Sequence, residues 1–134
     1  MVLIVFDTSV LIAYGLREPG FEEVKKWLNA VADGEAAGLI SAVTVCELLE
    51  KFTRINGTEV AIKALDLLKR SGVVVMEVTE RIARLAGPLK ARYPQLSTAD
   101  AIIMATAHVN KAALYTLDKG FWGVGGVELM GIGE

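Results

Sequence analysis

Hydrophobic residues follow two patterns along this chain: short unbroken apolar runs, and longer stretches in which they recur every three or four positions. The short runs contain β-branched residues and are typical of strands that are buried on both faces of a sheet. The longer stretches predict amphipathic helices. The strands are expected at residues 2–6, 38–41, 73–76, 113–116 and 127–130.

Glycine, proline and capping residues divide the helical stretches. A short helix is expected from residue 9 to 16, and Pro19 is expected to open a second one that ends at Gly34. A third helix ends at Asn56, and Thr58 is expected to cap the fourth, which Gly72 stops. Two more are expected from about residue 79 and from 98 to 110. The glycine-rich segment 120–126 predicts a loop.

Strands that alternate with helices indicate an α/β domain with a largely parallel sheet of about five short strands. The chain has 134 residues, a length that fits a single domain, 1–134, large enough to fold without a disulfide or a structural metal. No internal repeat or low-complexity segment interrupts it.

The hydrophobic share of 53% and a mean hydropathy of +0.45 exceed what a soluble domain usually has. Either the sheet is covered on both faces, or an apolar surface is reserved for a partner, or both are true. No apolar stretch reaches the roughly 20 residues that a membrane span needs, and residues 1–6 lack the basic flank of a signal peptide. Cys46 is the only cysteine; it is expected to be a buried hydrophobic residue, and a cytoplasmic location is expected.

Four carboxylates are candidates for one site. Open parallel sheets bind ligands at the carboxyl ends of their strands. Asp7 follows the first strand directly, Glu47 lies on the helix after the second, and Asp118 follows the fourth. Asp100 lies in the first turn of a helix that leads into the fourth strand, so its position at the same edge does not follow from the strand pattern.

Each of these residues also has a purely structural interpretation. Asp7 could cap the next helix, and Asp100 could complete a capping box with Ser97. Asp118 lies in an ordinary turn sequence, and Glu47 could belong to an exposed, salt-bridged helix face. Together, however, four carboxylates in an apolar domain repel one another unless a cation lies between them. Their oxygens suit Mg²⁺ or Mn²⁺, which activate water and offset the charge of a phosphodiester under attack.

Four motifs in order resemble those of PIN domains. These are an opening strand that ends in Asp-Thr-Ser (VLIVFDTSVLI), an SxxTxxE element (SAVTVCELL), a DxxIxATA helix (LSTADAIIMATAH) and a closing TxDxxF segment (ALYTLDKGF). They span nearly the whole chain. The resemblance implies a three-layer sandwich, with a parallel sheet between helices.

The same resemblance implies a Mg²⁺- or Mn²⁺-dependent ribonuclease. Asp7, Glu47, Asp100 and Asp118 match the acidic metal site of such domains. Thr8 and Thr116 would support it through hydroxyl hydrogen bonds, and in this family the residue that matches Asp100 faces the site. Lys119, Lys51 and Arg54 are candidates for steering RNA, although each could be an ordinary solvated charge. His108 is expected to be structural.

As a short PIN-like protein, this chain resembles the VapC-like toxins of toxin–antitoxin pairs. The resemblance implies an RNA substrate, a homodimer, and a small VapB-like antitoxin that inserts into a groove near the active site. Trp27, Phe52 and Ile55 could serve these interfaces or could be core. The alternatives are an RNA-processing nuclease without an antitoxin, or a module that binds RNA or antitoxin without catalysis. A net charge of -2 argues only against a uniformly basic surface.

Two other classes with a strand-end aspartate fit less well. Haloacid-dehalogenase-like phosphatases need a second aspartate two residues on, where this chain has Ser9. Response-regulator receivers carry theirs after a mid-chain strand, and the strand predicted at 73–76 ends without one.

Overall fold

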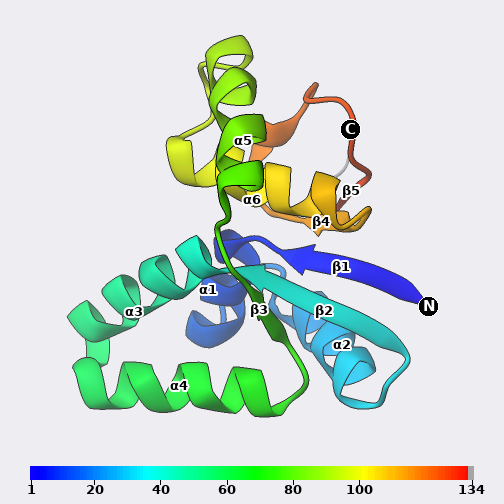
Figure 1. Ribbon diagram of the computed structural model, residues 1–134. Coiled ribbons are helices and arrows are strands. Elements are labelled where there is room, and N and C mark those ends of the chain that lie inside the picture. Colours follow the sequence, from blue (N-terminus) through cyan, green and yellow to red (C-terminus); the bar gives the residue numbers. More distant parts are fainter. Residues whose placement is uncertain (133–134) are drawn as a thin grey trace.

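The apolar runs form one parallel sheet in the computed structural model, which describes residues 1–132 (Figure 1). The sheet has five strands in the order β3-β2-β1-β4-β5, and every neighbouring pair is parallel. β2, β1 and β4 are therefore internal, as the continuous apolar runs predict. The strands are β1 (Val2–Phe6), β2 (Ala36–Ser41), β3 (Val74–Met76), β4 (Ala113–Tyr115) and β5 (Leu129–Met130).

Six α-helices and one 3₁₀ turn connect the strands. Two helices stand between each of the first three strands and the next, which is long enough for the crossover that parallel neighbours require. The helices are α1 (Thr8–Leu16), α2 (Phe21–Ala32), α3 (Ala42–Asn56), α4 (Thr58–Arg70), α5 (Glu80–Arg92) and α6 (Thr98–Val109); the 3₁₀ turn η1 (Lys119–Phe121) follows β4.

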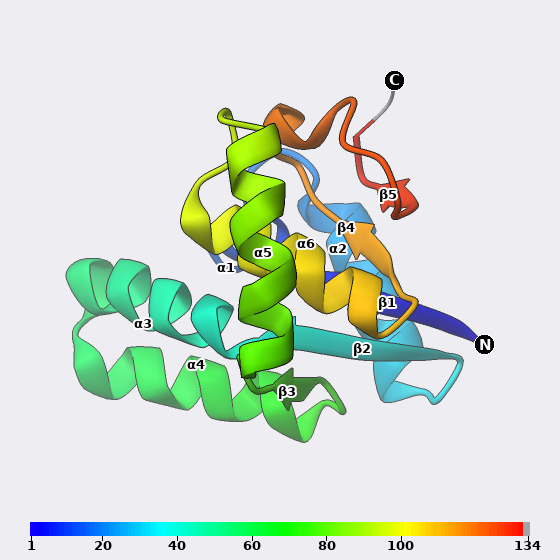
Figure 2. The same ribbon diagram turned by 45° about the horizontal axis from the view of Figure 1, so that its top comes forward.

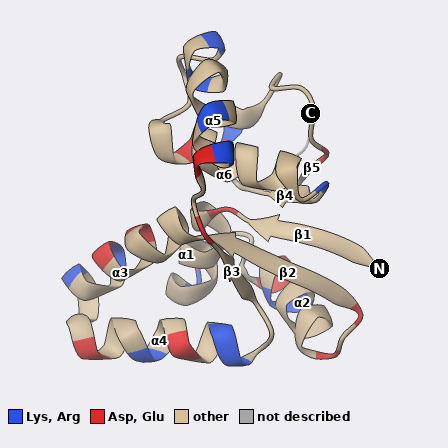
Figure 3. Cartoon of the chain, viewed as in Figure 1, with Lys and Arg blue, Asp and Glu red and all other residues tan. Residues whose placement is uncertain are grey.

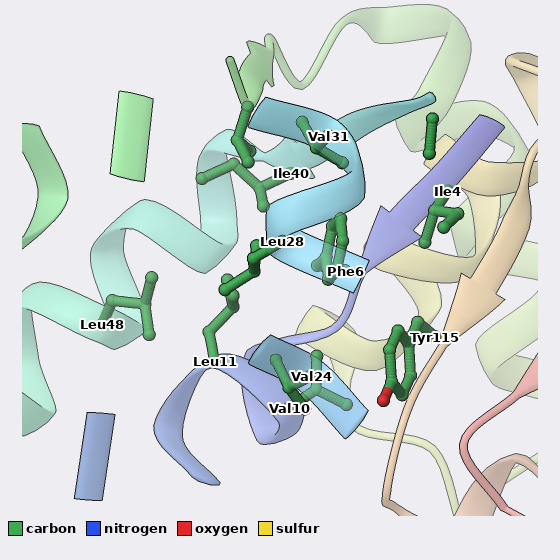
Figure 4. Packing of buried hydrophobic residues seen from close by; sticks show 12 residues of the cluster. Ile4, Phe6, Val10, Leu11, Val24, Leu28, Val31, Ile40, Leu48 and Tyr115 are labelled. Carbon is green, nitrogen blue, oxygen red and sulfur yellow. The ribbon is translucent and has the colours of Figure 1, made fainter. Parts of the chain in front are cut away.

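Alternate residues of the central strands serve two separate cores. Ile4 and Phe6 of β1 pack with Tyr115 of β4 against α1, α2 and α3, where Val10, Val24, Leu28 and Leu48 meet them (Figure 4). Val5 and its neighbour in β4, Leu114, point to the other face and pack against α6. The sheet is thus the middle of three layers, as the resemblance implied. This arrangement accounts for much of the high hydrophobic content.

The strand order reverses beside β1. The chain runs from β1 outward through β2 to β3 and then crosses back to β4, on the other side of β1. In open α/β sheets the crevice at such a switch point, outside the carboxyl ends of the strands, is where ligands bind. Figure 2 shows α5 and α6 carrying the chain across this point.

Several local predictions are wrong. Pro19 lies in a turn before α2 rather than in its first turn, and Gly57, with φ +87°, occupies the N-cap of α4 instead of Thr58. The predicted loop at 120–126 begins inside η1. Cys46 is exposed, because it lies on the side of α3 that turns away from the sheet. The second and third strands also differ from the predicted bounds, β2 beginning at residue 36 and β3 at residue 74.

Charged residues lie on the helices and in the loops, and the five strands contain none (Figure 3). Asp7 is the only charged residue of the described chain that is buried, and Glu47, Asp100 and Asp118 are half-buried, as is Lys90. No helix in the part of the chain that the structure describes is both long and apolar enough to cross a membrane.

A glycine after β5 fixes how the last strand meets the end of β4. Gly131 has φ +92°, and a Cβ atom there would overlap the carbonyl oxygen of Thr116. We expect Gly131→Ala to lower the free energy of unfolding by about 1–3 kcal/mol, because the strained backbone and the clash add together. Urea denaturation measures the loss. Gly125→Ala is the matched control: a Cβ atom at that position would have no neighbour within 4 Å, so we expect a change below about 0.5 kcal/mol.

Candidate active site

Asp7 occupies the switch point itself. It is the first residue after β1, and its backbone amide donates to the carbonyl oxygen of Tyr115, the last residue of β4, at 2.8 Å. Phe6 and Tyr115 are register partners, so β1 and β4 end at the same level. The two segments that follow these strands, carrying Asp7 and Thr116, therefore leave the sheet side by side.

Two hydroxyl groups hold the Asp7 carboxylate. Ser9 Oγ and Thr116 Oγ1 each donate to Asp7 Oδ2 at 2.7 Å. Each hydroxyl oxygen in turn accepts a backbone amide: Leu117 N donates to Ser9 Oγ at 3.0 Å and Asp118 N to Thr116 Oγ1 at 2.9 Å. A hydroxyl that accepts from an amide is polarised as a donor, so the chain after β4 helps to orient Asp7.

Burial makes the negative charge of Asp7 costly. The side chain is only 3% exposed. Burial and, to a smaller extent, the negative charge of Asp100 raise the pKa of the Asp7 carboxyl, and the Ser9 and Thr116 hydrogen bonds lower it; the net result is a pKa raised from 3.8 to about 6. The two carboxylates therefore repel each other when both are charged.

Glu47 is tied to the residue next to Asp7. Its Oε1 lies 2.6 Å from Thr8 Oγ1, which also lies 3.1 Å from Thr44 Oγ1. Ser41 begins this arrangement by accepting the amide of Val43 and so capping α3. The predicted salt-bridged helix face exists, but it does not contain Glu47: Arg54 pairs with Glu50. The SxxTxxE spacing thus turns Thr44 and Glu47 towards the start of α1.

Asp100 has the capping role that its structural interpretation gave it. Its Oδ2 accepts the amide of Ser97 at 2.9 Å, and Ser97 Oγ accepts the amide of Asp100 at 3.0 Å. This reciprocal pair is a complete capping box at the start of α6, although aspartate is not its usual second member. The bond from Ser97 uses one carboxylate oxygen of Asp100. Asp100 can therefore cap α6 and still raise the pKa of Asp7 through its negative charge.

Asp118 likewise closes a turn. Its Oδ1 accepts the amide of Gly120 at 2.8 Å and caps η1, while its own amide is held by Thr116. Phe121, fully buried, anchors this turn in the core beneath it. The turn therefore holds Asp118 two residues beyond the hydroxyl group that binds Asp7.

The four carboxylates are linked but do not form a closed cage. Within residues 1–132, no three Asp, Glu, His or Cys side chains converge with the spacing of metal ligands. The links are the charge interaction of Asp7 with Asp100, the Thr116 hydroxyl between Asp7 and Asp118, and Thr8 between Glu47 and the Asp7 backbone. These links reach all four residues.

The basic candidates lie apart from this network. Lys51 is exposed on α3, one helical turn beyond Glu47, and Arg54 is exposed and paired with Glu50. Lys119, directly after Asp118, is exposed as well. His108 is exposed at the far end of α6 from Asp100. Of these residues only Lys119 adjoins a carboxylate of the quartet in sequence.

Ser9 is a site residue that the sequence analysis did not select. It was considered only as the position where a phosphatase would need a second aspartate, yet its hydroxyl donates to Asp7. The signal was available: the strand ends in Asp-Thr-Ser, and the first turn of a helix can direct the second hydroxyl back towards the aspartate. Thr8, the nearer hydroxyl, turns to Glu47 instead.

The donor set suits a hard divalent cation. The groups are oxygen ligands, and among the described residues no Lys or Arg forms an ion pair with any of the four carboxylates. A cation between Asp7 and Asp100 would relieve the repulsion that raises the pKa of Asp7. Mg²⁺ keeps several waters and binds through one or two carboxylates and substrate phosphate, so an open arrangement is compatible with it.

Comparison with known proteins gives one family and a set of similar structures. The PIN domain family matches residues 4–126. A toxin–antitoxin complex from Klebsiella pneumoniae is 29% identical, with a TM-score of 0.71 over 92% of this chain and 94% of that chain. VapC20 of Mycobacterium tuberculosis, described as a toxin that cleaves the sarcin–ricin loop, is 23% identical, with a TM-score of 0.76 over 95% and 98%. Rickettsia felis VapBC2, bound to a fragment of its promoter DNA, is 17% identical, with a TM-score of 0.78 over 96% and 97%. No curated protein matches the sequence.

The raised pKa of Asp7 predicts how stability depends on pH. Below about pH 4 both the folded and the unfolded state bind the proton; as pH rises to 6 the unfolded state loses it first, so folding stability falls. Above pH 6 the loss in the free energy of unfolding reaches roughly 3 kcal/mol. Asp7→Asn stays neutral and can still accept both hydroxyl bonds. We therefore expect this variant to be the more stable protein at pH 8 and equal to the original at pH 3.5.

Urea denaturation between pH 3.5 and 8, with chelator present, measures this difference. Asp66→Asn, an exposed aspartate on α4, is the matched control and should leave the pH profile unchanged. Parallel profiles for Asp7→Asn and the original protein would contradict the assignment of a strained, buried carboxylate at this position.

Proposed function

Because the chain belongs to the PIN domain family, we propose that it is a nuclease of the toxin–antitoxin kind, a divalent-metal-dependent endoribonuclease that a small antitoxin restrains. The observation that carries this proposal is the buried Asp7 carboxylate, held by two hydroxyls at the switch point and repelled by Asp100. A purely structural carboxylate gains nothing from a second negative charge nearby. A carboxylate that binds a cation does gain from it, because two negative charges attract the cation more strongly than one.

The substrate is proposed from the family and from one structural neighbour. The Mycobacterium tuberculosis toxin of the same fold is described as cleaving the sarcin–ricin loop, an RNA target. The acidic network of this chain suits a phosphodiester that brings a divalent ion between itself and the carboxylates. We propose RNA as the substrate class, and we propose a cytoplasmic location.

Asp7, Asp100 and Asp118 would hold the ion, and Mg²⁺ or Mn²⁺ is the cation that such oxygen ligands suit. When bound, it would lower the pKa of coordinated water and offset the charge that develops on the phosphate. The residues supply the rest. Ser9 and Thr116 fix Asp7 Oδ2, burial excludes bulk water from Asp7, and the capping bond holds Asp100 in one rotamer.

Glu47 has a separate part in the proposal. Thr8 holds one oxygen of its carboxylate, so the other can accept a hydrogen bond from the attacking water and orient it. Lys119, Lys51 and Arg54 remain candidates for steering the RNA backbone. Lys119 is favoured because it directly follows Asp118, whereas Arg54 is neutralised by Glu50.

An apolar groove between α1, α2, α3 and α4 is the proposed antitoxin site. A cavity of about 450 Å³ lies there, lined by Leu11, Tyr14, Leu48, Phe52, Leu65 and Leu68 among others. Trp27 and Phe52 are half-buried and pack against the core, and Ile55 is 49% exposed outside the groove. An amphipathic helix of a small partner could place its apolar side in such a groove. We also propose a homodimer, as in the VapC-like resemblance.

The first test is cleavage of mixed RNA substrates with Mg²⁺ or Mn²⁺. We expect the protein to cut RNA, chelator to abolish cutting, and Asp100→Asn to lower the rate at least a hundredfold. The asparagine can keep the capping bond to Ser97 but removes the negative charge, so folding and ion binding are separated.

Asp66→Asn, purified in the same way, is the control for this experiment, since it removes an exposed carboxylate far from the network. Equal cutting by Asp100→Asn and the original protein would mean that Asp100 only caps α6 or that a contaminant cuts. If the original protein cuts no RNA but binds it, the alternative of a non-catalytic binding module is favoured.

The proposed antitoxin site is tested by substituting exposed residues of α4 at the edge of the groove and outside it. Leu67 lines the groove and is 63% exposed, whereas Ile62, on the same helix and 45% exposed, does not line it. We expect a small antitoxin encoded by the neighbouring gene to co-purify with the protein. Leu67→Glu should weaken this binding at least tenfold, because it puts a charge on the apolar lining, and Ile62→Glu should not.

Both variants should keep RNA cleavage, since neither residue belongs to the acidic network. If no neighbouring gene encodes such a partner, the RNA-processing alternative replaces the toxin proposal. If both variants bind the partner as the original does, the antitoxin lies elsewhere.

A further inference from the structure

A large aromatic side chain stands exposed beside the acidic network. Trp122 directly follows η1, the turn that Asp118 caps, and is 43% exposed. None of the proposed catalytic or partner-binding roles uses it. Indole rings combine a large apolar surface with a polar N–H group and are enriched at binding interfaces, so an exposed tryptophan four residues after Asp118 is a candidate for contact with the substrate.

The turn holds Trp122 in a fixed relation to Asp118. Gly120 N donates to Asp118 Oδ1 at 2.8 Å, and Trp122 N donates to the Lys119 carbonyl oxygen at 3.1 Å. Phe121, between them, is fully buried in the core. Because Phe121 occupies the interior position, the next residue, Trp122, is turned outward. The ring is therefore attached to a rigid turn, and not to a free loop.

A positive charge accompanies the ring. Lys119 Nζ lies 5.2 Å from the centroid of the Trp122 ring, within the range of a cation–π interaction. The segment before α6 supports the same turn, since Gln95 Nε2 donates to the Gly120 carbonyl oxygen at 3.5 Å. In Figure 2 the segment that follows β4 lies beside the end of α5. An aromatic face and an ammonium group thus lie together on the turn that Asp118 caps.

This combination matches the chemistry of unpaired RNA. Proteins bind single strands by stacking bases on exposed aromatic rings and by placing Lys or Arg against the phosphates. We infer that Trp122 stacks an unpaired base next to the phosphodiester held at the acidic network, while Lys119 binds a flanking phosphate. The inference rests on the proposed ribonuclease function and adds the two residues that contact the substrate next to the acidic network.

Binding is tested with a fluorescein-labelled, single-stranded RNA of about 12 nucleotides and mixed sequence, in the Asp100→Asn background with Mg²⁺ so that the probe stays intact. We expect Trp122→Ala to raise the Kd about tenfold and Trp122→Phe, which keeps an aromatic face, to change it less than about threefold. Leu85→Ala is the control; this leucine is 40% exposed on α5 and has no part in the site.

Two further measurements separate stacking from charge. In a Trp27→Phe background, Trp122 is the only tryptophan, and RNA should quench its fluorescence. Lys119→Gln should reduce the dependence of log Kd on log salt by about one phosphate contact, whereas Trp122→Ala should leave it unchanged. An unchanged Kd for Trp122→Ala, or no quenching, overturns the inference.

Different results would contradict the ribonuclease proposal and the stacking role of Trp122. If the protein cuts RNA and Trp122→Ala cuts with the same KM, the stacking role is wrong and the ribonuclease proposal stands. If the protein neither cuts nor binds RNA, the ribonuclease proposal fails and the stacking role fails with it. If a labelled, fully duplex RNA of the same length binds equally well, the preference for unpaired RNA is wrong.

Discussion

The active-site proposal depends on one buried carboxylate. Asp7 directly follows the central strand and is buried between that strand and α1. Two hydroxyls compensate part of the cost of its charge, and the remaining cost appears as a raised pKa. A fold that kept this residue for stability alone would do better with an asparagine. The cost is understandable if a cation completes the site.

The hydroxyls connect this constraint to the rest of the fold. Thr116 and Ser9 accept backbone amides from the segment after β4, so the position of Asp7 depends on how that segment leaves the sheet. The same segment carries Asp118 and, through the buried Phe121, presents Lys119 and Trp122 to solvent. One short stretch of chain therefore orients the deepest carboxylate and forms the proposed contact surface for RNA.

Asp100 shows that structural and functional interpretations need not compete. The capping box with Ser97 is complete, yet the charge of Asp100 still raises the pKa of Asp7. Capping fixes the rotamer, and a fixed rotamer is what an ion ligand needs. For Glu47 the structural interpretation was wrong, because the salt bridge of α3 joins Glu50 to Arg54 and leaves Glu47 to Thr8.

The sequence by itself determined the layers, since the unbroken apolar runs at 2–6 and 113–116 indicate strands covered on both faces, and helical spacing supplied the covers. Its motifs also selected the four carboxylates and Thr116. It could not determine the strand order, because a buried strand has the same hydrophobic pattern whichever strand lies beside it. Only the tertiary structure set β4 beside β1 and thereby brought Ser9 and Thr116, 107 positions apart, onto the same oxygen of Asp7. It also exposed Cys46 and formed η1, since both depend on what packs against them rather than on local pattern.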